Sequence, residues 1–256
     1  MAHLLFIVGM AGSGKSALTG SYLEWLRNKD QDVISLNLDP GATSLPYNPE
    51  IDARKYVDVQ QLMSDYSLGP NGALIMASDL LADHLEEIRE EIDKANPDLI
   101  LADTPGQIEL FAFREGGRFI ANELPEDDCA LIYLMDSSFT RLPLNFISNF
   151  YLAAAIYSRV MKPQIYVLSK SDLITDEDID SIISWTTDPE SFDQALLSVK
   201  EQTMSLITRD LANAVFASGL VTEPIPVSAK NNSGLLELDA AVTRIVSGGQ
   251  QATMDS

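Results

Sequence analysis

One short segment near the start of the chain constrains the fold more than any other. Residues 9–16 read GMAGSGKS and fit the pattern G-x-x-x-x-G-K-[ST] at every defined position. An apolar run precedes the segment and a helical pattern follows it, which is the context in which this pattern forms a phosphate-binding loop, or P-loop. The alternative interpretation is a glycine-rich turn between a strand and a helix that carries a surface lysine.

The P-loop pattern also predicts how the segment would hold a nucleotide. Its glycines allow successive backbone N–H groups to surround phosphate oxygens at the positive end of the following helix. Lys15 is expected to reach the β- and γ-phosphates, and the Ser16 hydroxyl is expected to bind Mg²⁺. The residues predicted to contact the nucleotide here are Gly12, Ser13, Gly14, Lys15, Ser16 and Ala17.

The rest of the chain alternates short apolar runs with longer helical patterns. The expected strands are His3–Val8, Val33–Asp39, Asp98–Asp103, Cys129–Met135, Gln164–Ser169 and Ile225–Val227. The expected helices are Lys15–Asn28, Val57–Asp65, Gly72–Ala95, Phe111–Asn122, Leu144–Ser158, a stretch within Ile179–Phe216, and Leu235–Ile245. Near-continuous Val, Ile and Leu strands separated by helices indicate a mostly parallel sheet with helices on both faces. We therefore predict a doubly wound α/β fold that binds ligands at the carboxyl ends of its strands.

Length and composition are consistent with a single P-loop domain over residues 1–246. The chain has 256 residues, of which 46% are hydrophobic, so it can bury a sizeable core. Two segments between predicted strands are longer than the single helix that a simple alternation of strands and helices needs. One lies at about 40–95, and the other, which is helical, lies at about 175–220. We interpret both as insertions into the domain. The final segment SGGQQATMDS predicts a flexible tail over residues 247–256.

Charge, hydropathy and cysteine content limit the partners and the location of the protein. The chain has 38 acidic and 17 basic residues, a formal charge of −21. Proteins that bind nucleic-acid backbones usually carry a basic field, so no direct nucleic-acid binding is expected. No apolar run approaches the length of a membrane span, so no membrane association is expected. The single cysteine, Cys129, cannot form an internal disulfide, which favours a cytoplasmic location.

A second polar segment, DLILADTPGQ at residues 98–107, ends another predicted strand. Asp103 stands at the end of that strand and is expected to hold Mg²⁺, directly or through water. Gly106 would offer its backbone N–H to a γ-phosphate, and Gln107 would orient an attacking water molecule. Read alone, the segment is a Pro-Gly turn after a core strand, followed by a solvated glutamine. The P-loop upstream favours the nucleotide interpretation.

Two further segments after predicted strands resemble motifs that read guanine. Residues 167–173, VLSKSDL, resemble the N-K-x-D motif of GTPases, with Ser169 where asparagine is usual. The Asp172 carboxylate would accept hydrogen bonds from guanine N1–H and N2–H₂, a donor pair that adenine lacks. Lys170 would lie along the base. Either segment alone is typical of a surface loop, and the serine leaves the choice between GTP and ATP open. The residues expected around the base are Ser169, Lys170, Asp172, Ser228, Ala229 and Lys230.

The order GMAGSGKS, NLDPGA, GPN, DTPGQIELF, LSKSDL, VSAK resembles the GPN-loop GTPase family from about residue 3 to residue 246. The most specific pieces are the GPN triplet between the second and fourth segments and the extended DTPGQIELF. The resemblance implies a P-loop NTPase of the dimerising SIMIBI type that binds GTP or GDP with Mg²⁺. The length of the chain, without a long C-terminal extension, resembles the archaeal, homodimeric members of the family.

The resemblance also implies roles for residues that spacing alone does not explain. Asp39 would lie near the γ-phosphate and the metal and would position the attacking water together with Asp103 and Gln107. The trans loop would be Gly69, Pro70 and Asn71, and it would reach the nucleotide of the partner subunit. There the Asn71 amide would act as a donor where negative charge develops.

Some departures and alternatives accompany these roles. Related dimerising P-loop proteins often carry a lysine where this chain has Met10, which makes another group acting in trans more plausible. Gly41 stands where alanine is expected in NLDPGA. Without the family match, Asp39 is the start of a turn, and GPN is a turn that begins a helix.

The combined prediction is a Mg²⁺-dependent GTPase that cycles between conformations of a dimer, with the assembly of protein complexes as a role that such a switch could serve. The sequence does not name the client protein. One alternative is a scaffold that binds GTP without hydrolysing it. The other is a nucleoside or polynucleotide kinase, although the chain lacks a clustered arginine lid. Phosphate release from GTP without an acceptor distinguishes hydrolysis from transfer.

Overall fold

The strands that the structure describes form one parallel sheet. The structure, a computed structural model, describes the backbone of residues 2–124, 129–197 and 202–247. In that part of the chain, seven strands pair in the order β3-β2-β4-β1-β5-β6-β7, and each neighbouring pair is parallel. The strands are β1 (His3–Gly9), β2 (Val33–Asn37), β3 (Ile51–Asp52), β4 (Leu99–Asp103), β5 (Cys129–Asp136), β6 (Gln164–Ser169) and β7 (Ile225–Val227). The predicted doubly wound α/β fold is confirmed.

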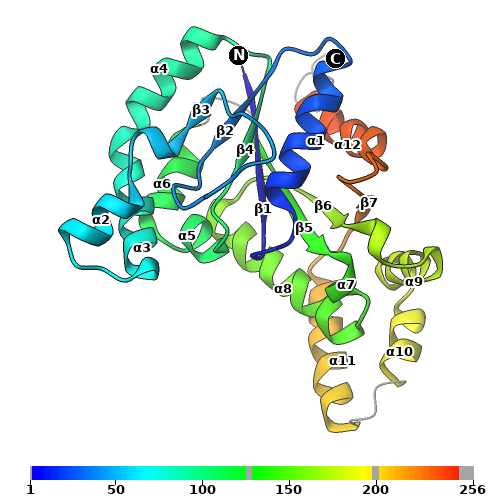
Figure 1. Cartoon of the computed structure of the whole chain (residues 1–256). Coiled ribbons are helices and arrows are strands. Elements are labelled where there is room, and N and C mark those ends of the chain that lie inside the picture. The colour runs from blue at the N-terminus through cyan, green and yellow to red at the C-terminus, as the bar shows by residue number, and fades with distance from the viewer. Residues whose placement is uncertain (1, 125–128, 198–201, 248–256) are drawn as a thin grey trace, which may run out of the picture.

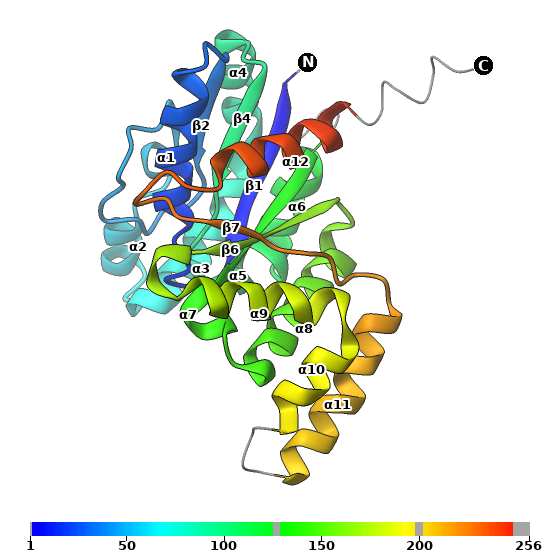
Figure 2. The same ribbon diagram turned by 90° about the vertical axis from the view of Figure 1, so that its right-hand side faces the viewer.

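Alternate side chains of the strands face two separate apolar cores. On β1, Leu4 and Phe6 join one core, whereas Leu5 joins the other, as the two-residue period of a strand requires. Helices α1 (Lys15–Arg27) and α12 (Leu235–Ser247) cover the second core. Figures 1 and 2 show these two helices on one face of the sheet and most of the others on the opposite face. Both faces are therefore covered, which is why the central strands are almost entirely apolar.

The remaining helices complete the two layers. They are α2 (Val59–Asp65), α3 (Pro70–Leu80), α4 (Leu85–Ala95), α5 (Ile108–Ala112), α6 (Glu115–Glu123), α7 (Ser137–Thr140), α8 (Pro143–Val160), α9 (Asp176–Thr187), α10 (Pro189–Leu197) and α11 (Gln202–Ala217). Three short 3₁₀ helices are η1 (Ala53–Lys55), η2 (Leu81–His84) and η3 (Ser171–Leu173). Among the described residues, no helix is both long and apolar enough to span a lipid bilayer.

Two features of the sheet differ from the sequence prediction. Strand β3 was not predicted, because its two residues are too few for a periodic pattern. It forms by pairing with the end of β2, where Asn37 lies opposite Asp52. Strand β2 ends at Asn37 and not at Asp39. The Asp39 backbone N–H donates to the Asn37 side chain at 3.0 Å, and this hydrogen bond turns the chain away from the sheet.

Two predicted helices are wrong in their continuity. The helix predicted over Gly72–Ala95 begins earlier, at Pro70, which suits the first turn of a helix, and η2 interrupts it. The helix predicted over Phe111–Asn122 is two helices, α5 and α6. A Cβ atom at Gly117 would lie 2.3 Å from the Leu110 carbonyl oxygen, so α6 folds back closely onto α5. This contact is tertiary and has no signature in helical periodicity.

The strand order places the loops of interest at one edge of the sheet. Strand β1 lies between β4 and β5, so the chain order reverses at β1. In doubly wound folds, ligands bind at the carboxyl ends of the strands on either side of this point. The segments that follow β1, β2, β4, β6 and β7 all start at that edge. Most of the predicted site residues lie in these segments; the GPN triplet is the exception.

Candidate functional site

The P-loop joins β1 to α1 at the centre of the sheet. Gly12 and Gly14 have φ angles of +77° and +94°, in the left-handed region that favours glycine. Gly14 is the N-cap residue of α1, and Lys15 is its first helical residue. The strand, loop and helix context predicted from the sequence is therefore confirmed. It presents the N-terminus of a helix at the carboxyl edge of the sheet, where an anion is favoured.

The Lys15 ammonium group is buried beneath the loop. Its Nζ atom donates to the Gly9 carbonyl at 2.9 Å, to the Met10 carbonyl at 3.2 Å and to the Gly106 carbonyl at 3.4 Å. Burial lowers the pKa of Lys15, and the negative charges of Asp103 and Asp39 oppose that shift. The P-loop cation is thus held close to the two carboxylates that follow β2 and end β4.

Asp103 has the environment of a cation ligand. Its Oδ2 atom accepts from the Tyr47 hydroxyl at 3.0 Å, whereas its buried Oδ1 atom has no hydrogen-bond partner among the described residues. Burial raises the pKa of Asp103 to about 6, although Ser16, Tyr47 and Lys15 each favour the charged form. A buried carboxylate with an unpaired oxygen beside a serine hydroxyl fits Mg²⁺, which prefers oxygen ligands.

The protein would supply only part of such a metal shell. Among the described residues, no cluster of three or more His, Cys, Asp or Glu side chains could hold a metal alone. Mg²⁺ commonly keeps several water molecules and binds one or two carboxylates together with substrate phosphates. The set at this edge, Ser16 with Asp103 and Asp39 nearby, matches that mode of binding.

Asp39 connects the segment after β2 to the segment after β4. Its Oδ1 atom accepts from the Gly41 N–H at 2.9 Å, and its Oδ2 atom accepts from the Gly106 N–H at 3.1 Å. The Gly106 N–H, which the sequence assigned to a γ-phosphate, therefore donates to a carboxylate in this structure. Gln107 follows at the start of α5 and is half-buried. The structure thus brings Asp39, Asp103, Gly106 and Lys15 together.

The segments after β6 and β7 line a separate pocket beside the P-loop. Its volume is about 250 Å³. The Ser228 hydroxyl donates to Asp172 Oδ1 at 2.6 Å, which fixes the carboxylate. The exposed Lys230 approaches the other oxygen of Asp172 at 4.0 Å. The lining residues are Ser13, Gly14, Ala17, Leu18, Val167, Ser169, Lys170, Asp172, Leu173, Val227, Ala229 and Lys230.

Ser169 and Lys170 tie this pocket to the P-loop. The Ser169 hydroxyl donates to the Ser13 carbonyl at 2.8 Å, so the serine joins β6 to the P-loop although asparagine is usual there. The Lys170 ammonium donates to the Gly12 carbonyl and to Asp136 Oδ2, the latter at 2.7 Å. The departure from the N-K-x-D motif therefore leaves the framework of the pocket in place.

Comparisons with known proteins identify relatives of this chain. A family model described as "Conserved hypothetical ATP binding protein" matches residues 7–248. The GPN-loop GTPase PAB0955 of Pyrococcus abyssi is 35% identical over 178 residues, which cover 68% of this chain and 70% of that protein. GPN-loop GTPase 1 of Dictyostelium discoideum is 30% identical over 236 residues, which cover 91% of this chain and 59% of that protein. The chain belongs to the GPN-loop GTPase family.

The fold and the length of the chain also match a member of this family. A crystal structure of PAB0955, a GTPase in apo form from Pyrococcus abyssi, superposes with a TM-score of 0.84 at 28% identity. The superposition covers 95% of this chain and 97% of that chain. Several curated GPN-loop GTPases are longer, since the chain spans only 54% to 60% of three of them.

The GPN triplet that names the family begins α3. Gly69 is the N-cap residue, Pro70 is the first helical residue, and Asn71 follows in the first turn with an exposed side chain. Among the described residues, no hydrogen bond joins Asn71 to the P-loop. One turn further along α3, Leu74 packs directly on Gly41, where a Cβ atom would lie 2.2 Å from Leu74 Cδ2.

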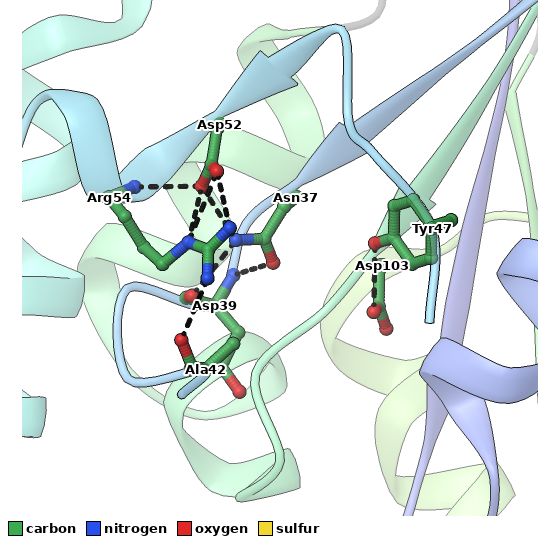
Figure 3. Close-up of polar contacts among 7 residues, drawn as sticks. All are labelled: Asn37, Asp39, Ala42, Tyr47, Asp52, Arg54 and Asp103. Carbon is green, nitrogen blue, oxygen red and sulfur yellow. Dashed lines mark hydrogen bonds and ion pairs between the residues drawn. The ribbon is translucent and has the colours of Figure 1, made fainter. Parts of the chain in front are cut away.

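No role was predicted from the sequence for four polar residues that surround Asp39 and Asp103, although one of them begins the NLDPGA segment. These residues are Asn37, Tyr47, Asp52 and Arg54, and they lie on or after β2 and β3 (Figure 3). The available signal was weak. Asn37 ends the apolar run of β2, whereas Asp52 follows a single apolar residue, Ile51. The register that places the two residues opposite each other depends on a strand too short to predict.

Proposed function

We propose that this GPN-loop protein binds GTP with Mg²⁺, hydrolyses it to GDP and phosphate, and acts as a nucleotide-driven switch. The decisive observation is the shared edge of the sheet. A P-loop, two carboxylates beside Lys15, and a pocket with a fixed aspartate all lie there. Residues 1–246 would act as one domain, and the protein would work in the cytoplasm as a homodimer without binding nucleic acid directly.

The residues of the chain would divide the work of hydrolysis. The P-loop N–H groups and Lys15 would bind the phosphates, while Ser16, Asp103 and Asp39 would hold Mg²⁺. Bound Mg²⁺ would offset the negative charge on the phosphate oxygens. A γ-phosphate would take the Gly106 N–H from Asp39, which would free the Asp39 carboxylate to accept a hydrogen bond from the attacking water. Gln107 would orient that water.

The pocket between β6 and β7 supports guanine as the base. Guanine offers two N–H donors on one edge, and the Asp172 carboxylate has the acceptors to meet them. Adenine lacks this donor pair, so the acceptor sites of Asp172 that Ser228 does not satisfy would have no partner on the base, which costs about 1–3 kcal/mol. The family description mentions ATP, whereas the curated relatives are named as GTPases. The fixed carboxylate favours the second description.

Asp172→Asn is expected to weaken GTP binding about ten- to hundredfold, because an amide donor would then face the guanine donors. Xanthosine triphosphate presents an acceptor at that edge, so its affinity for the variant should rise relative to the affinity of GTP. Titration of both nucleotides into the variant measures this exchange. The exposed Asp176, at the start of α9, provides the matched control Asp176→Asn. If Asp172→Asn binds GTP with unchanged affinity, Asp172 does not recognise the base.

Phosphate release from GTP with Mg²⁺, without any added acceptor, tests the hydrolase directly. Asp39→Ala and Gln107→Ala are each expected to lower the rate at least about tenfold, because each removes a group that positions the water. Formation of GDP that requires an added nucleoside or polynucleotide, with the γ-phosphoryl group found on that acceptor and no free phosphate, would indicate a kinase. Binding of GTP without release, or release unchanged in both variants, would indicate a scaffold that binds GTP.

A further inference from the structure

The buried side chain of Asn37 forms hydrogen bonds with both the backbone N–H and the backbone carbonyl of Asp39. Asn37 Oδ1 accepts from the Asp39 N–H at 3.0 Å, and Asn37 Nδ2 donates to the Asp39 carbonyl at 3.1 Å. Asn37 is 0% exposed. Because the amide both donates and accepts here, its orientation determines the direction in which the chain leaves β2, and therefore where the Asp39 carboxylate points.

The orientation of that amide is set by an ion pair on the neighbouring strand. Asn37 Nδ2 also donates to Asp52 Oδ1 at 2.9 Å, so the acceptor at this position fixes which end of the amide faces β3. Asp52, at the end of β3, accepts three hydrogen bonds of 2.7 to 3.1 Å from the Arg54 guanidinium and one of 3.1 Å from the Arg54 backbone N–H (Figure 3). Burial alone would raise the pKa of Asp52, but the hydrogen bonds from Arg54 and Asn37 lower it.

Arg54 also holds the far end of the Asp39 segment. Its Nη1 atom donates to the Ala42 carbonyl at 3.1 Å. The turn over residues 39–42 is thus fixed at its start through Asn37 and at its end through Arg54, and Asp52 connects the two (Figure 3). Between these points lies the Gly41 N–H that binds the Asp39 carboxylate.

We propose that Asn37, Asp52 and Arg54 are positioning residues for Asp39, which hold its carboxylate toward Gly106 and the γ-phosphate site. The proposal rests on the function proposed above for Asp39. None of the three residues has a hydrogen bond to the P-loop, Asp103 or Gly106 among the described residues. Their effect on hydrolysis would therefore pass through the 39–42 turn and leave nucleotide binding almost unchanged.

The chain supplies a matched control pair. Arg27 and Glu50 form an ion pair of 2.7 Å, and Glu50 Oε2 accepts from both the N–H and the hydroxyl of Ser35 at 2.8 Å. This pair also ties β2 to the segment before β3. Among the described residues, no hydrogen bond or ion pair joins Arg27 or Glu50 to the 39–42 turn. Arg27→Lys and Glu50→Gln match Arg54→Lys and Asp52→Asn in chemistry, although the control pair is more exposed.

The test compares GTP hydrolysis by Arg54→Lys and Asp52→Asn with hydrolysis by the control variants. We expect kcat to fall about five- to fiftyfold with KM within about threefold, because geometry is lost while binding is kept. In an Asp39→Ala background, Arg54→Lys should cause less than a twofold further loss, since residues acting through one group are not additive. Equal losses in both backgrounds, an unchanged kcat, or an equal loss in Glu50→Gln would overturn the proposal.

Hydrogen exchange of the nucleotide-free protein gives a readout independent of activity. The Asp39 and Gly41 N–H groups are expected to exchange at least tenfold faster in Arg54→Lys and Asp52→Asn, and at the parental rate in Arg27→Lys and Glu50→Gln. Equal exchange in all four variants would overturn the positioning role. If the parent releases no phosphate but exchange changes as expected, the hydrolase function fails while the structural basis of the positioning stands.

Discussion

Replacing Asp103 by asparagine is expected to stabilise the nucleotide-free protein and, at the same time, to abolish most of its Mg²⁺-dependent hydrolysis. Burial raises the pKa of Asp103 to about 6 from a model-compound value of 3.8. The folded state thus holds this proton more tightly than the unfolded state does. As a result, the free energy of unfolding falls as the pH rises from about 4 to about 6, and it stays lowered above that range.

The expected gain in the free energy of unfolding follows from the pKa shift of Asp103. About two pKa units correspond to about 3 kcal/mol, and asparagine, which carries no charge, avoids this cost. We expect Asp103→Asn to unfold at a higher denaturant concentration at pH 7.5, with a gain of about 1–3 kcal/mol, and to match the parent near pH 4. The exposed Asp98, next to the start of β4, gives the control Asp98→Asn. If Asp103→Asn is less stable than the parent at pH 7.5, the buried charged carboxylate of Asp103 does not destabilise the folded protein.

The same substitution should remove a ligand of the metal. An amide oxygen binds Mg²⁺ more weakly than a carboxylate, so phosphate release should fall at least about a hundredfold. Raising the Mg²⁺ concentration should restore part of the rate. If Asp103→Asn is stabilised but hydrolyses GTP at the parental rate, Asp103 is not a ligand of the metal.

The second large effect concerns the GPN loop. Asn71→Ala is expected to lower kcat by about 10²–10³, the usual cost of losing one donor where charge develops in the transition state. Because Asn71 is exposed at the start of α3, we expect the substitution to leave folding intact, and a thermal unfolding curve checks this. The exposed Gln61 of α2, in the same inserted segment, supplies the control Gln61→Ala.

Mixing two inactive variants tests whether Asn71 acts on the partner subunit. In a heterodimer of Asn71→Ala with Lys15→Ala, one site keeps its own Lys15 and faces an intact Asn71. Statistical exchange of subunits in a symmetric dimer should then recover about a quarter of the parental rate per protein. If Asn71 acts within its own subunit, every site in the mixture lacks one group and no activity returns.

Much of the fold was predictable because the pattern of apolar residues along the chain indicates which segments are buried. Strands β1, β4, β5 and β6 are runs buried on both faces, and their positions were predicted to within one residue at each end. What escaped prediction depends on contacts between distant segments. Strand β3 exists through its pairing with β2, and the break between α5 and α6 depends on close packing at Gly117.

The candidate site shows the same division. Residues that would contact a nucleotide fall into short patterns, because one loop must present several groups at fixed spacing. Tyr47, Asp52 and Arg54 support those residues from outside the motifs. Tyr47 reaches Asp103 across 56 positions of sequence, and Arg54 reaches Ala42 only because β3 lies beside β2. Such contacts become visible once the chain is folded.

The close packing of Leu74 on Gly41 has a consequence for two subunits acting together. Gly41 belongs to the turn that holds Asp39, and Leu74 lies one turn after Asn71 on α3. A shift of the turn when a γ-phosphate arrives would push on α3, whose beginning would face the other nucleotide if Asn71 acts in trans as proposed. In the proposed homodimer, the two nucleotides would therefore be hydrolysed in step, and the rate would depend more steeply than linearly on the fraction of sites filled with GTP.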